Sequence, residues 1–164
     1  MPYRPGMAYS PQDYTFDLGA LVNARGVVRL ETKNKIDALE ILIEALARRK
    51  EVTSKEKLRR AIKDREKILS TGIGHCLAVP HAKIAQVKEF CMVVGLSKTG
   101  IPFDSQDGRL VHIIFMIAAP ELRHTEYLSI LGLITRYFRD EQVRNRLLGT
   151  KDTKSAVAIL TEAR

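Results

Sequence analysis

The stretch from Leu110 to Ala119 is almost entirely apolar and is closed by Pro120. It predicts a strand buried on both faces, because a strand with one wet face would alternate apolar and polar residues. Such a strand needs a layer of helices on each side of its sheet. His112 lies inside this run, and we interpret it as a core or strand-end residue rather than a catalytic one.

The rest of the chain alternates shorter strands with helices. Val27–Leu30 and Phe90–Ser97 predict two more strands, and the residues from Lys98 to Gly100 predict a turn after the second. The expected inward rows of three longer helices are Ile36, Leu39, Ile43 and Leu46; Leu58, Ile62, Arg65 and Leu69; and His124, Leu128, Leu131, Thr135 and Phe138. Two short helices are expected over Glu141–Leu148 and Lys154–Ala163. We therefore predict an α/β fold, a single domain with a mixed β-sheet flanked by helices on both faces.

Two of the helix starts carry capping signals. Thr32 or Asn34 can cap the first long helix with a side-chain oxygen. Thr53, with Glu56 three residues later, has the spacing of a capping box and predicts the start of the second.

A length of 164 residues fits one domain with a sizeable core. We divide the chain into an N-terminal arm over residues 1–17, mobile or loosely docked, and a domain over residues 18–164. No apolar run approaches the ~20 residues that span a bilayer, and the N-terminus lacks the apolar segment of a signal peptide. We expect a cytoplasmic protein without direct membrane insertion.

The net charge of +8 calls for an explanation. Basic residues concentrate in residues 48–50 and 55–67, but Glu51, Glu56, Asp64 and Glu66 lie among them. This mixture is typical of a solvated helical surface and not of a basic stripe with stacking aromatics. Nucleic acid is therefore not the expected partner.

Neither the cysteines nor the histidines form a metal-binding pattern. Cys76 and Cys91 lie in apolar stretches and are expected to be small buried thiols, because two cysteines make neither a disulfide framework nor a zinc pattern. The spacing of His75, His81 and His124 matches no standard zinc motif. We predict no metal site.

The segment Ser70–Lys83 carries the strongest indication of function. Gly72 and Gly74 allow a tight turn and a close approach to a bound group. A short buried strand over residues 76–79 follows, and Pro80 ends it, leaving His81 at its exit. Imidazole suits proton or phosphoryl transfer at neutral pH, although a histidine after a proline can equally be a structural turn residue.

The order of this run resembles the signature of the enzyme IIA domains of the fructose–mannitol class, in the bacterial sugar phosphotransferase system. This class includes the stand-alone nitrogen-regulatory type, which the run also resembles. The matching letters are T-G-I-G-H-x-L-A-V-P-H-A-K, and a second piece, G-I-P-F-D-S-Q-D-G-R-L-V-H-I-I-F-M-I-A-A-P, is similar to the later sheet region. The resemblance covers about Leu18 to Leu160. It implies the same α/β fold and a phosphoryl group accepted on His81. Cys76 stands where the family usually has glycine, which could tighten the loop beside His81.

Two further residues join the candidate site. Arg65 is either a cation that snorkels from an apolar face or a fork aimed at a phosphoryl group on His81. His124 opens a helix, on what spacing predicts is its buried side, and is either a packing residue or a second site imidazole. The resemblance favours the site role for both, since the family has an arginine upstream of the T-G-I-G motif and a second histidine opening the corresponding helix.

The resemblance implies a phosphotransferase that works as a relay. A histidine phosphocarrier protein upstream would pass a phosphoryl group to Nε2 of His81. Arg65 would neutralise the phosphoryl oxygens, and His124 with backbone N–H groups around Thr71, Gly72 and Gly74 would supply hydrogen bonds. A IIB component or a regulated protein would be the downstream partner, and the absence of a fused IIB segment favours a regulator. No cofactor is expected, because the phosphoryl donor is a protein.

One function of another class stays open. The chain could be a catalytically silent binding module with this fold that uses its basic surface for an acidic or nucleic-acid partner. Nucleic-acid binding that depends steeply on salt and survives His81→Ala would support that alternative.

Overall fold

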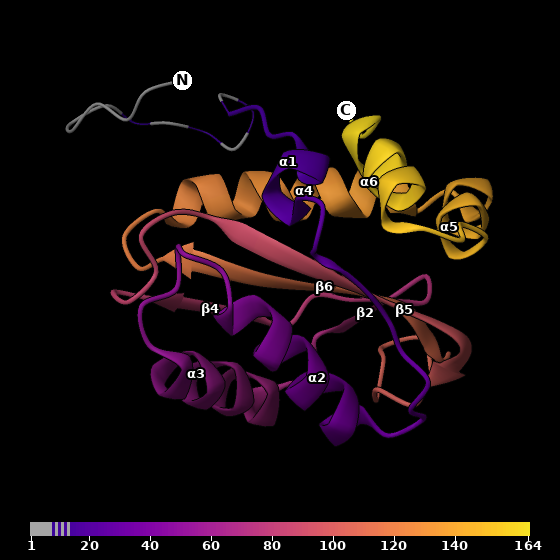
Figure 1. Cartoon of the computed structure of the whole chain (residues 1–164), viewed down its shortest axis with the longest axis horizontal. Helices are drawn as coiled ribbons and strands as arrows, with labels where there is room; N and C mark the ends of the chain where they lie inside the picture. Colours follow the sequence, from indigo (N-terminus) through magenta and orange to yellow (C-terminus); the bar gives the residue numbers. More distant parts are fainter. Residues whose placement is uncertain (1–7, 9, 11, 13) are drawn as a thin grey trace.

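The structure, a computed structural model, describes residues 8, 10, 12 and 14–164. At its centre is β6 (Val111–Pro120), which confirms the strand predicted from the apolar run (Figure 1). β6 pairs antiparallel with β5 (Cys91–Ile101) on one side, and in parallel with β3 (Leu77–Ala78) and β4 (His81–Ile84) on the other.

Two shorter strands complete a mixed sheet. β1 (Val27–Arg29) pairs in parallel with β5, and β2 (Gly72–Gly74) pairs antiparallel with β3. The strand order is β1-β5-β6-β3-β2, and β4 lies beside β6 off this path.

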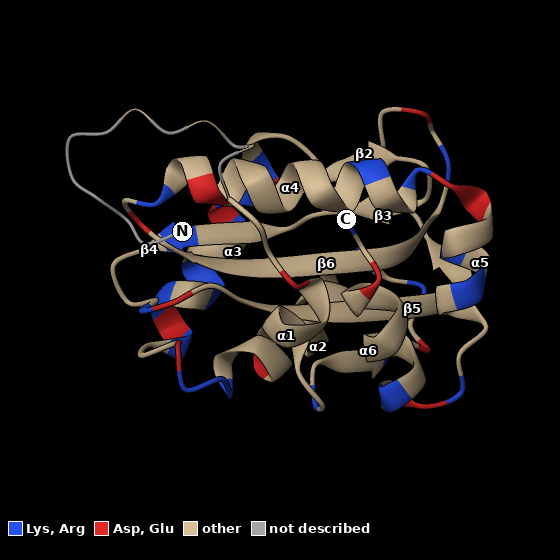
Figure 2. Ribbon diagram, turned by 90° about the horizontal axis from the view of Figure 1, so that it is seen from above, with Lys and Arg blue, Asp and Glu red and all other residues tan. Residues whose placement is uncertain are grey.

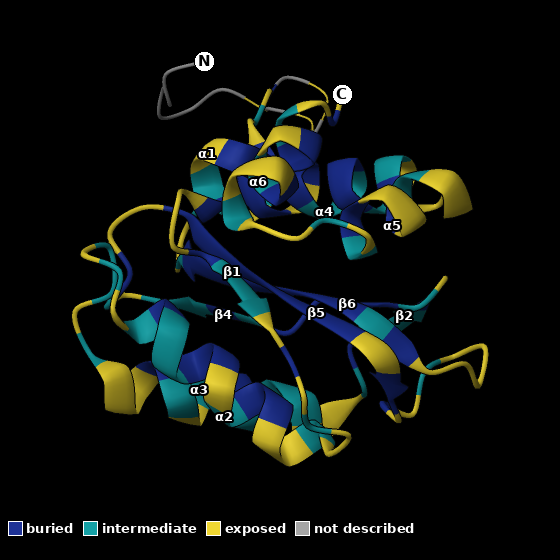
Figure 3. Ribbon diagram, turned by 45° about the vertical axis from the view of Figure 1, so that its right-hand side comes forward, coloured by how far each residue is buried: buried dark blue, intermediate teal, exposed yellow. Residues whose placement is uncertain are grey.

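Helices cover both faces of the sheet. On one face lie α2 (Lys35–Ala47) and α3 (Lys55–Ile68); on the other lie α1 (Leu18–Val22), α4 (His124–Phe138), α5 (Glu141–Leu148) and α6 (Thr153–Thr161) (Figure 1). β6 contributes to both resulting cores, since Phe115 and Ile117 pack with one set of helices while Ile114 and Met116 pack with the other. The long central strands are accordingly buried along most of their length (Figure 3). The predicted fold class is confirmed.

The capping residues are partly those predicted. Asn34, one of the two candidates, caps α2, because its side-chain oxygen accepts from the N–H of Asp37 at 3.1 Å. The predicted Thr53 cap of α3 is wrong: Ser54 is the capping residue, accepting from Lys57 N at 3.3 Å. The Thr53 hydroxyl instead donates to the carbonyl of Gln86 at 2.9 Å, which ties the start of α3 to the segment after β4.

Two strand boundaries differ from prediction. The expected turn over residues 98–100 is absent, because β5 continues to Ile101 with a register shift against β6 and with Gly100 at φ +85°. The expected loop after His81 is instead the strand β4, which pairs with the last residues of β6. Both segments become strands through pairing with a distant partner, which local composition does not report.

Two of the predicted inward rows are wrong at helix ends. Ile36, in the first turn of α2, and Leu69, just beyond α3, are 67% and 63% exposed. Both lie where the buried stripe of their helix stops.

The predicted inward row of α4 is confirmed at Phe138, which is buried, but is wrong at the start of the helix. His124 and Leu128 are exposed, so His124 is not on the buried side. The large apolar residues that α4 buries are Tyr127, Ile130, Leu133, Ile134 and Phe138. Because apolar residues occupy more than one face of α4, spacing alone did not identify the face that meets the sheet.

The mixed-sign surface predicted for residues 55–67 is present. Arg59 forms ion pairs with Glu40, Glu44 and Glu56, and Lys63 pairs with Glu40. Over the ribbon as a whole, basic and acidic positions are interspersed (Figure 2). Arg59 and Lys63 are thus compensated within the protein.

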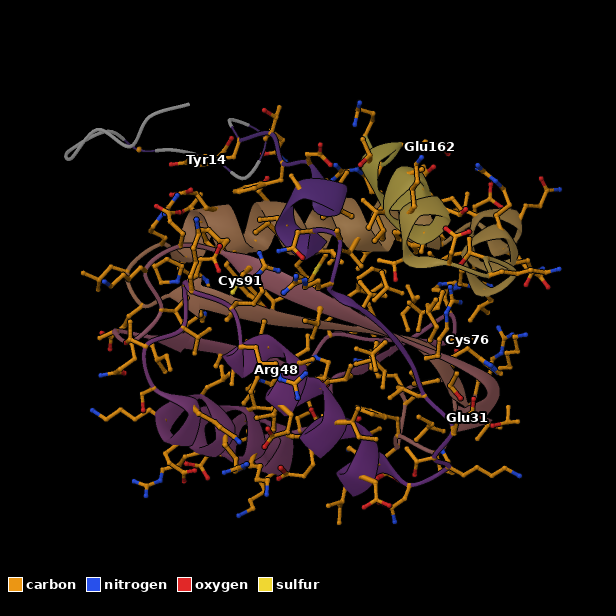
Figure 4. The ribbon with its side chains drawn as sticks, in the orientation of Figure 1. Tyr14, Glu31, Arg48, Cys76, Cys91 and Glu162 are labelled. Atoms are coloured by element: carbon orange, nitrogen blue, oxygen red, sulfur yellow. The ribbon has the colours of Figure 1, made fainter. Side chains whose placement is uncertain are left out.

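The two cysteines have different environments. Cys91 is buried, and burial raises the pKa of its thiol to about 12. Cys76 is only half-buried, so the expectation of a buried thiol is wrong there. The two side chains lie well apart (Figure 4), and both thiols are free.

Most of the N-terminal arm, residues 1–7, 9, 11 and 13, lies outside the described residues. The end of the arm is packed: Tyr14 is buried, its carbonyl accepts from the Ser129 hydroxyl at 3.1 Å, and the ring of Phe16 meets the edge of Phe90. Within the described part of the chain, no helix combines the length and hydrophobicity needed to cross a bilayer.

Candidate functional site

A break between two short strands places His81. Leu77 and Ala78 of β3 pair with Ile113 and Ile114 of β6, and His81 begins β4 opposite Ile117 further along the same strand. Pro80 lies in the interruption, because proline has no N–H for the ladder. Alternation along β4 then directs Ala82 into the core under α2 and α3, and His81 and Lys83 to the side of α4.

One hydrogen bond defines the protonation of the His81 ring. Its Nδ1 lies 3.0 Å from the carbonyl oxygen of Val79. A carbonyl only accepts, so Nδ1 must carry the proton, and a neutral imidazole then has its lone pair on Nε2. Burial is the main cause that lowers the pKa of His81, and the charges of Arg65 and Lys83 act in the same direction. The ring is therefore held as a neutral imidazole whose lone pair is on Nε2.

Tyr127 of α4 forms the wall of the site. Its ring centroid lies 4.8 Å from that of His81, and the ammonium of Lys83 lies 4.8 Å from the same centroid. Burial raises the pKa of the Tyr127 hydroxyl to about 12, so the hydroxyl stays protonated at neutral pH. The aromatic face thus fixes the imidazole and a cation side by side.

His124 contacts Lys83 and not the ring of His81. Its Nδ1 lies 2.7 Å from Lys83 Nζ. An ammonium only donates, so Nδ1 of His124 accepts and its Nε2 carries the proton. Burial and the charge of Arg65 lower the pKa of Lys83.

Arg65 lies in the last turn of α3, and its Nη1 donates to the carbonyl of Leu69 at 2.8 Å. Its charge contributes to the lowered pKa of His81 and Lys83 and partly opposes the rise in the pKa of Tyr127, which places the guanidinium within electrostatic reach of all three. Among the described residues, no ion pair includes Arg65 or Lys83. Two cations without carboxylate partners flank a neutral imidazole, an arrangement suited to an anion.

The glycine segment forms a two-residue hairpin between β2 and β3. His75 and Cys76 have φ of 54° and 63°, as a type I′ turn requires at both central positions. Cys76 thus occupies a left-handed backbone position that favours glycine. The N–H of His75 donates to Asp107 Oδ2 at 3.0 Å.

The loop donors expected to hold a phosphoryl group are partly in use. The N–H of Thr71 donates to Glu66 Oε1 at 3.0 Å, and its hydroxyl donates to Glu66 Oε2 at 2.6 Å. The N–H of Gly72 donates to the Ser70 hydroxyl at 3.1 Å. Thr71 and Gly72 therefore shape the loop and have no free N–H to offer, while Gly74, at φ +90°, opens the turn.

In the structure, the charges of Arg65 and Lys83 lie within electrostatic reach of His81, and His124 joins the group by its contact with Lys83. Sequence reasoning missed Lys83, Tyr127 and Glu66. Lys83 follows His81 by two residues and shares its face of β4, but this signal appears only in a strand, and the sequence predicts a loop there. Tyr127 lies on a face of α4 that spacing does not predict as buried.

His112 has a structural environment, since its Nδ1 lies 2.8 Å from the Ser97 carbonyl between the paired strands β5 and β6. Within the described part of the chain, His, Cys, Asp and Glu side chains form no group of three that could hold a metal ion.

Comparisons with known proteins agree on one family. The family model described as phosphoenolpyruvate-dependent sugar phosphotransferase system, EIIA 2, matches residues 21–163. The chain is 31% identical over 142 residues to a nitrogen regulatory protein of Klebsiella oxytoca, covering 85% of each chain. It is 30% identical over 135 residues to the fructose-specific EIIABC component of Bacillus subtilis, covering 82% of this chain but only 21% of that protein.

A solved structure shares the fold. The crystal structure of the nitrogen regulatory protein IIA-Ntr from Neisseria meningitidis matches with a TM-score of 0.80 and 27% identity, covering 87% of this chain and 98% of that one. The family model spans nearly the whole domain, including the strand break that carries His81. The chain therefore belongs to the EIIA 2 family of the phosphoenolpyruvate-dependent sugar phosphotransferase system.

Proposed function

We propose that this protein is a phosphohistidine carrier in which Nε2 of His81 accepts a phosphoryl group from a histidine phosphocarrier protein. The observation that carries the proposal is the hydrogen bond from Nδ1 of His81 to the Val79 carbonyl, which leaves Nε2 as the nucleophile. The P–N bond of the donor breaks as the new P–N bond to Nε2 forms, while the proton stays on Nδ1, which donates it to the Val79 carbonyl in a hydrogen bond.

The surrounding residues have defined roles in this proposal. Phosphoryl transfer depends mainly on positioning and charge stabilisation. Arg65 and Lys83 compensate the charge of the phosphoryl oxygens, a role supported by their having no carboxylate partner among the described residues. His124 holds Lys83 in place through Nδ1, and Tyr127 orients the imidazole. Thr71, Gly72 and Gly74 shape the loop that carries the Val79 carbonyl.

The phosphoryl group then has one of two destinations. It passes to a IIB component for sugar uptake, or it marks a regulator whose binding to a target protein depends on phosphorylation. The alignment with the Klebsiella nitrogen regulatory protein along most of both chains favours the regulator. The name of the Bacillus relative, which joins A, B and C components, favours transfer to IIB. We place either activity in the cytoplasm, where the phosphocarrier partner acts.

The test is phosphorylation from phosphoenolpyruvate, the general first enzyme and the histidine phosphocarrier protein. We expect an acid-labile mass gain of one phosphoryl group that disappears in His81→Ala. His75→Asn is the matched control, because His75 lies on the exposed turn and asparagine tolerates its positive φ. A folded wild-type protein that gains no phosphoryl group would overturn the proposal and support the silent binding module.

The destination is tested with the phosphorylated protein. Transfer of the group to an added IIB component identifies the transport role. Retention of the group, together with capture of a target by only one phosphorylation state, identifies the regulator.

A further inference from the structure

A continuous set of hydrogen bonds leads from α2 to the imidazole of His81. Lys35 Nζ lies 2.8 Å from Glu66 Oε1, and both oxygens of Glu66 accept from Thr71. The Thr71 carbonyl accepts from the N–H of Val79 at 3.0 Å. The Val79 carbonyl in turn accepts from Nδ1 of His81 at 3.0 Å.

The carboxylate of Glu66 is the anchor of this set. Its side chain is only 7% exposed, and a buried carboxylate is stable only when it is paired and hydrogen-bonded. Lys35 provides the charge, and its ammonium is itself held 4.5 Å from the centroid of the Phe103 ring. Because an ionised carboxylate only accepts, both the N–H and the hydroxyl of Thr71 must point at it.

Val79 transmits this constraint to the site. It lies in the break between β3 and β4, where its carbonyl bonds to His81 rather than to β6. Its N–H is directed back to Thr71, which prolongs the β2–β3 ladder by one bond. The orientation of the Val79 peptide, and with it the carbonyl that His81 uses, therefore depends on where Thr71 is held.

We infer that Glu66 is a positioning residue that, through Thr71 and Val79, keeps His81 in its Nδ1–H tautomer. The inference rests on the proposed function, since that tautomer matters because it leaves Nε2 as the acceptor. When the hydrogen bonds between Glu66 and Thr71 are weakened, part of the His81 population takes the Nε2–H tautomer, in which Nε2 has no lone pair to attack phosphorus.

The test combines two readouts on wild type, Glu66→Gln, Thr71→Val and Thr71→Ser. Glu66→Gln keeps the shape but removes the charge and one acceptor, and Thr71→Val removes only the hydroxyl bond. Thr71→Ser keeps the hydroxyl bond to Glu66 and is the conservative variant against which Thr71→Val is compared. The control is Glu40→Gln, which removes an α2 carboxylate that pairs with Lys63 and Arg59 away from the site.

The first readout is the ¹⁵N spectrum of the His81 ring at a pH of about 8, above the ordinary histidine pKa of ~6.5. We expect the Nδ1–H tautomer in wild type, Thr71→Ser and Glu40→Gln, and a mixture of tautomers in Glu66→Gln and Thr71→Val. The second readout is the phosphoryl acceptance rate, which we expect to fall about five- to tenfold in those two variants, the effect of one weakened hydrogen bond.

Unfolding in urea shows that each variant is native under the assay conditions, and if Glu66→Gln does not fold, Thr71→Val alone decides. An unchanged Nδ1–H spectrum in the folded variants would overturn the inference, as would a wild type already in the Nε2–H tautomer. Because the spectrum needs no phosphoryl donor, a wild type that accepts no phosphoryl group refutes the proposed function and leaves the tautomer result standing.

Discussion

Replacing Arg65 by glutamine tests whether the cation at the end of α3 serves the phosphoryl group. Glutamine keeps a polar side chain that can donate but removes the charge and the guanidinium fork. In the present structure that charge helps to lower the pKa of His81 and Lys83. We therefore expect Arg65→Gln to slow phosphoryl acceptance and, separately, to raise the pKa of His81 towards its ordinary value.

The size of the rate effect follows from the contact that is lost. A hydrogen bond to a charged group contributes about 1.5–3 kcal/mol, and each ~1.4 kcal/mol changes a rate tenfold. Arg65 is only half-buried, and its Nη1 already donates to Leu69, so water screening places the effect at the lower end. We expect a rate about 10- to 30-fold lower than that of wild type.

The assay is rapid-quench phosphorylation by an excess of phosphorylated carrier protein, beside an NMR titration of His81. Arg65→Lys is the matched variant: it keeps the charge, so the pKa of His81 stays where it is in wild type, but it loses the fork, so the rate falls only in part. Loss of the bond to Leu69 lowers the free energy of unfolding by about 1 kcal/mol in Arg65→Gln, which urea titration measures.

An Arg65→Gln rate within a factor of about two of wild type, below the effect of one weak hydrogen bond, would refute the reasoning about the site. If the pKa of His81 also failed to rise, the guanidinium would be a helix-end residue that bonds Leu69 and serves no phosphoryl group.

Three further predictions concern the loop and its histidine. Burial lowers the pKa of His81, so between that pKa and ~6.5 the native state binds fewer protons than the unfolded chain. The contribution of neutral His81 to stability is therefore complete above pH ~6.5 and is lost as the pH falls through the native pKa. Urea unfolding from pH ~7 to ~5 should show this decrease in the free energy of unfolding in wild type and not in His81→Gln. Cys76→Gly should raise the free energy of unfolding by about 1 kcal/mol by relieving the left-handed position, whereas Cys76→Ala, which keeps a Cβ, should be no more stable than wild type. Gly72→Ala should lower it by about 1–3 kcal/mol, because the added Cβ would overlap the Ser105 hydroxyl, while Gly132→Ala, inside α4, should be neutral or stabilising; equal unfolding midpoints for both alanine variants would contradict this.

The parts of the fold that follow from local composition were predictable. The apolar run before Pro120 has no polar face to turn towards water, so both of its faces must be buried. It accordingly forms the central strand β6. Pro80 must interrupt a ladder because it lacks an N–H, and the strand break that sets His81 follows from that chemistry alone. Asn34 was found as one of two capping candidates because a cap acts on its own helix.

The parts that depend on a distant partner were not predictable. β4 is a strand only because the end of β6 lies beside it, and β5 runs through its expected turn for the same reason. The buried face of α4 is decided by the sheet, which selects Tyr127 from a helix with apolar residues on several sides. Lys83 joins the site through that same choice.

The sequence by itself therefore determined the α/β class, the central strand and the histidine that follows Pro80, because each depends on the chemistry of neighbouring residues. Only the tertiary structure decided what surrounds that histidine. Arg65 arrives from α3, Tyr127 and His124 from α4, and Glu66 reaches the ring through Thr71 and Val79. These contacts join residues from opposite faces of one sheet, and packing of the whole domain is what brings them together.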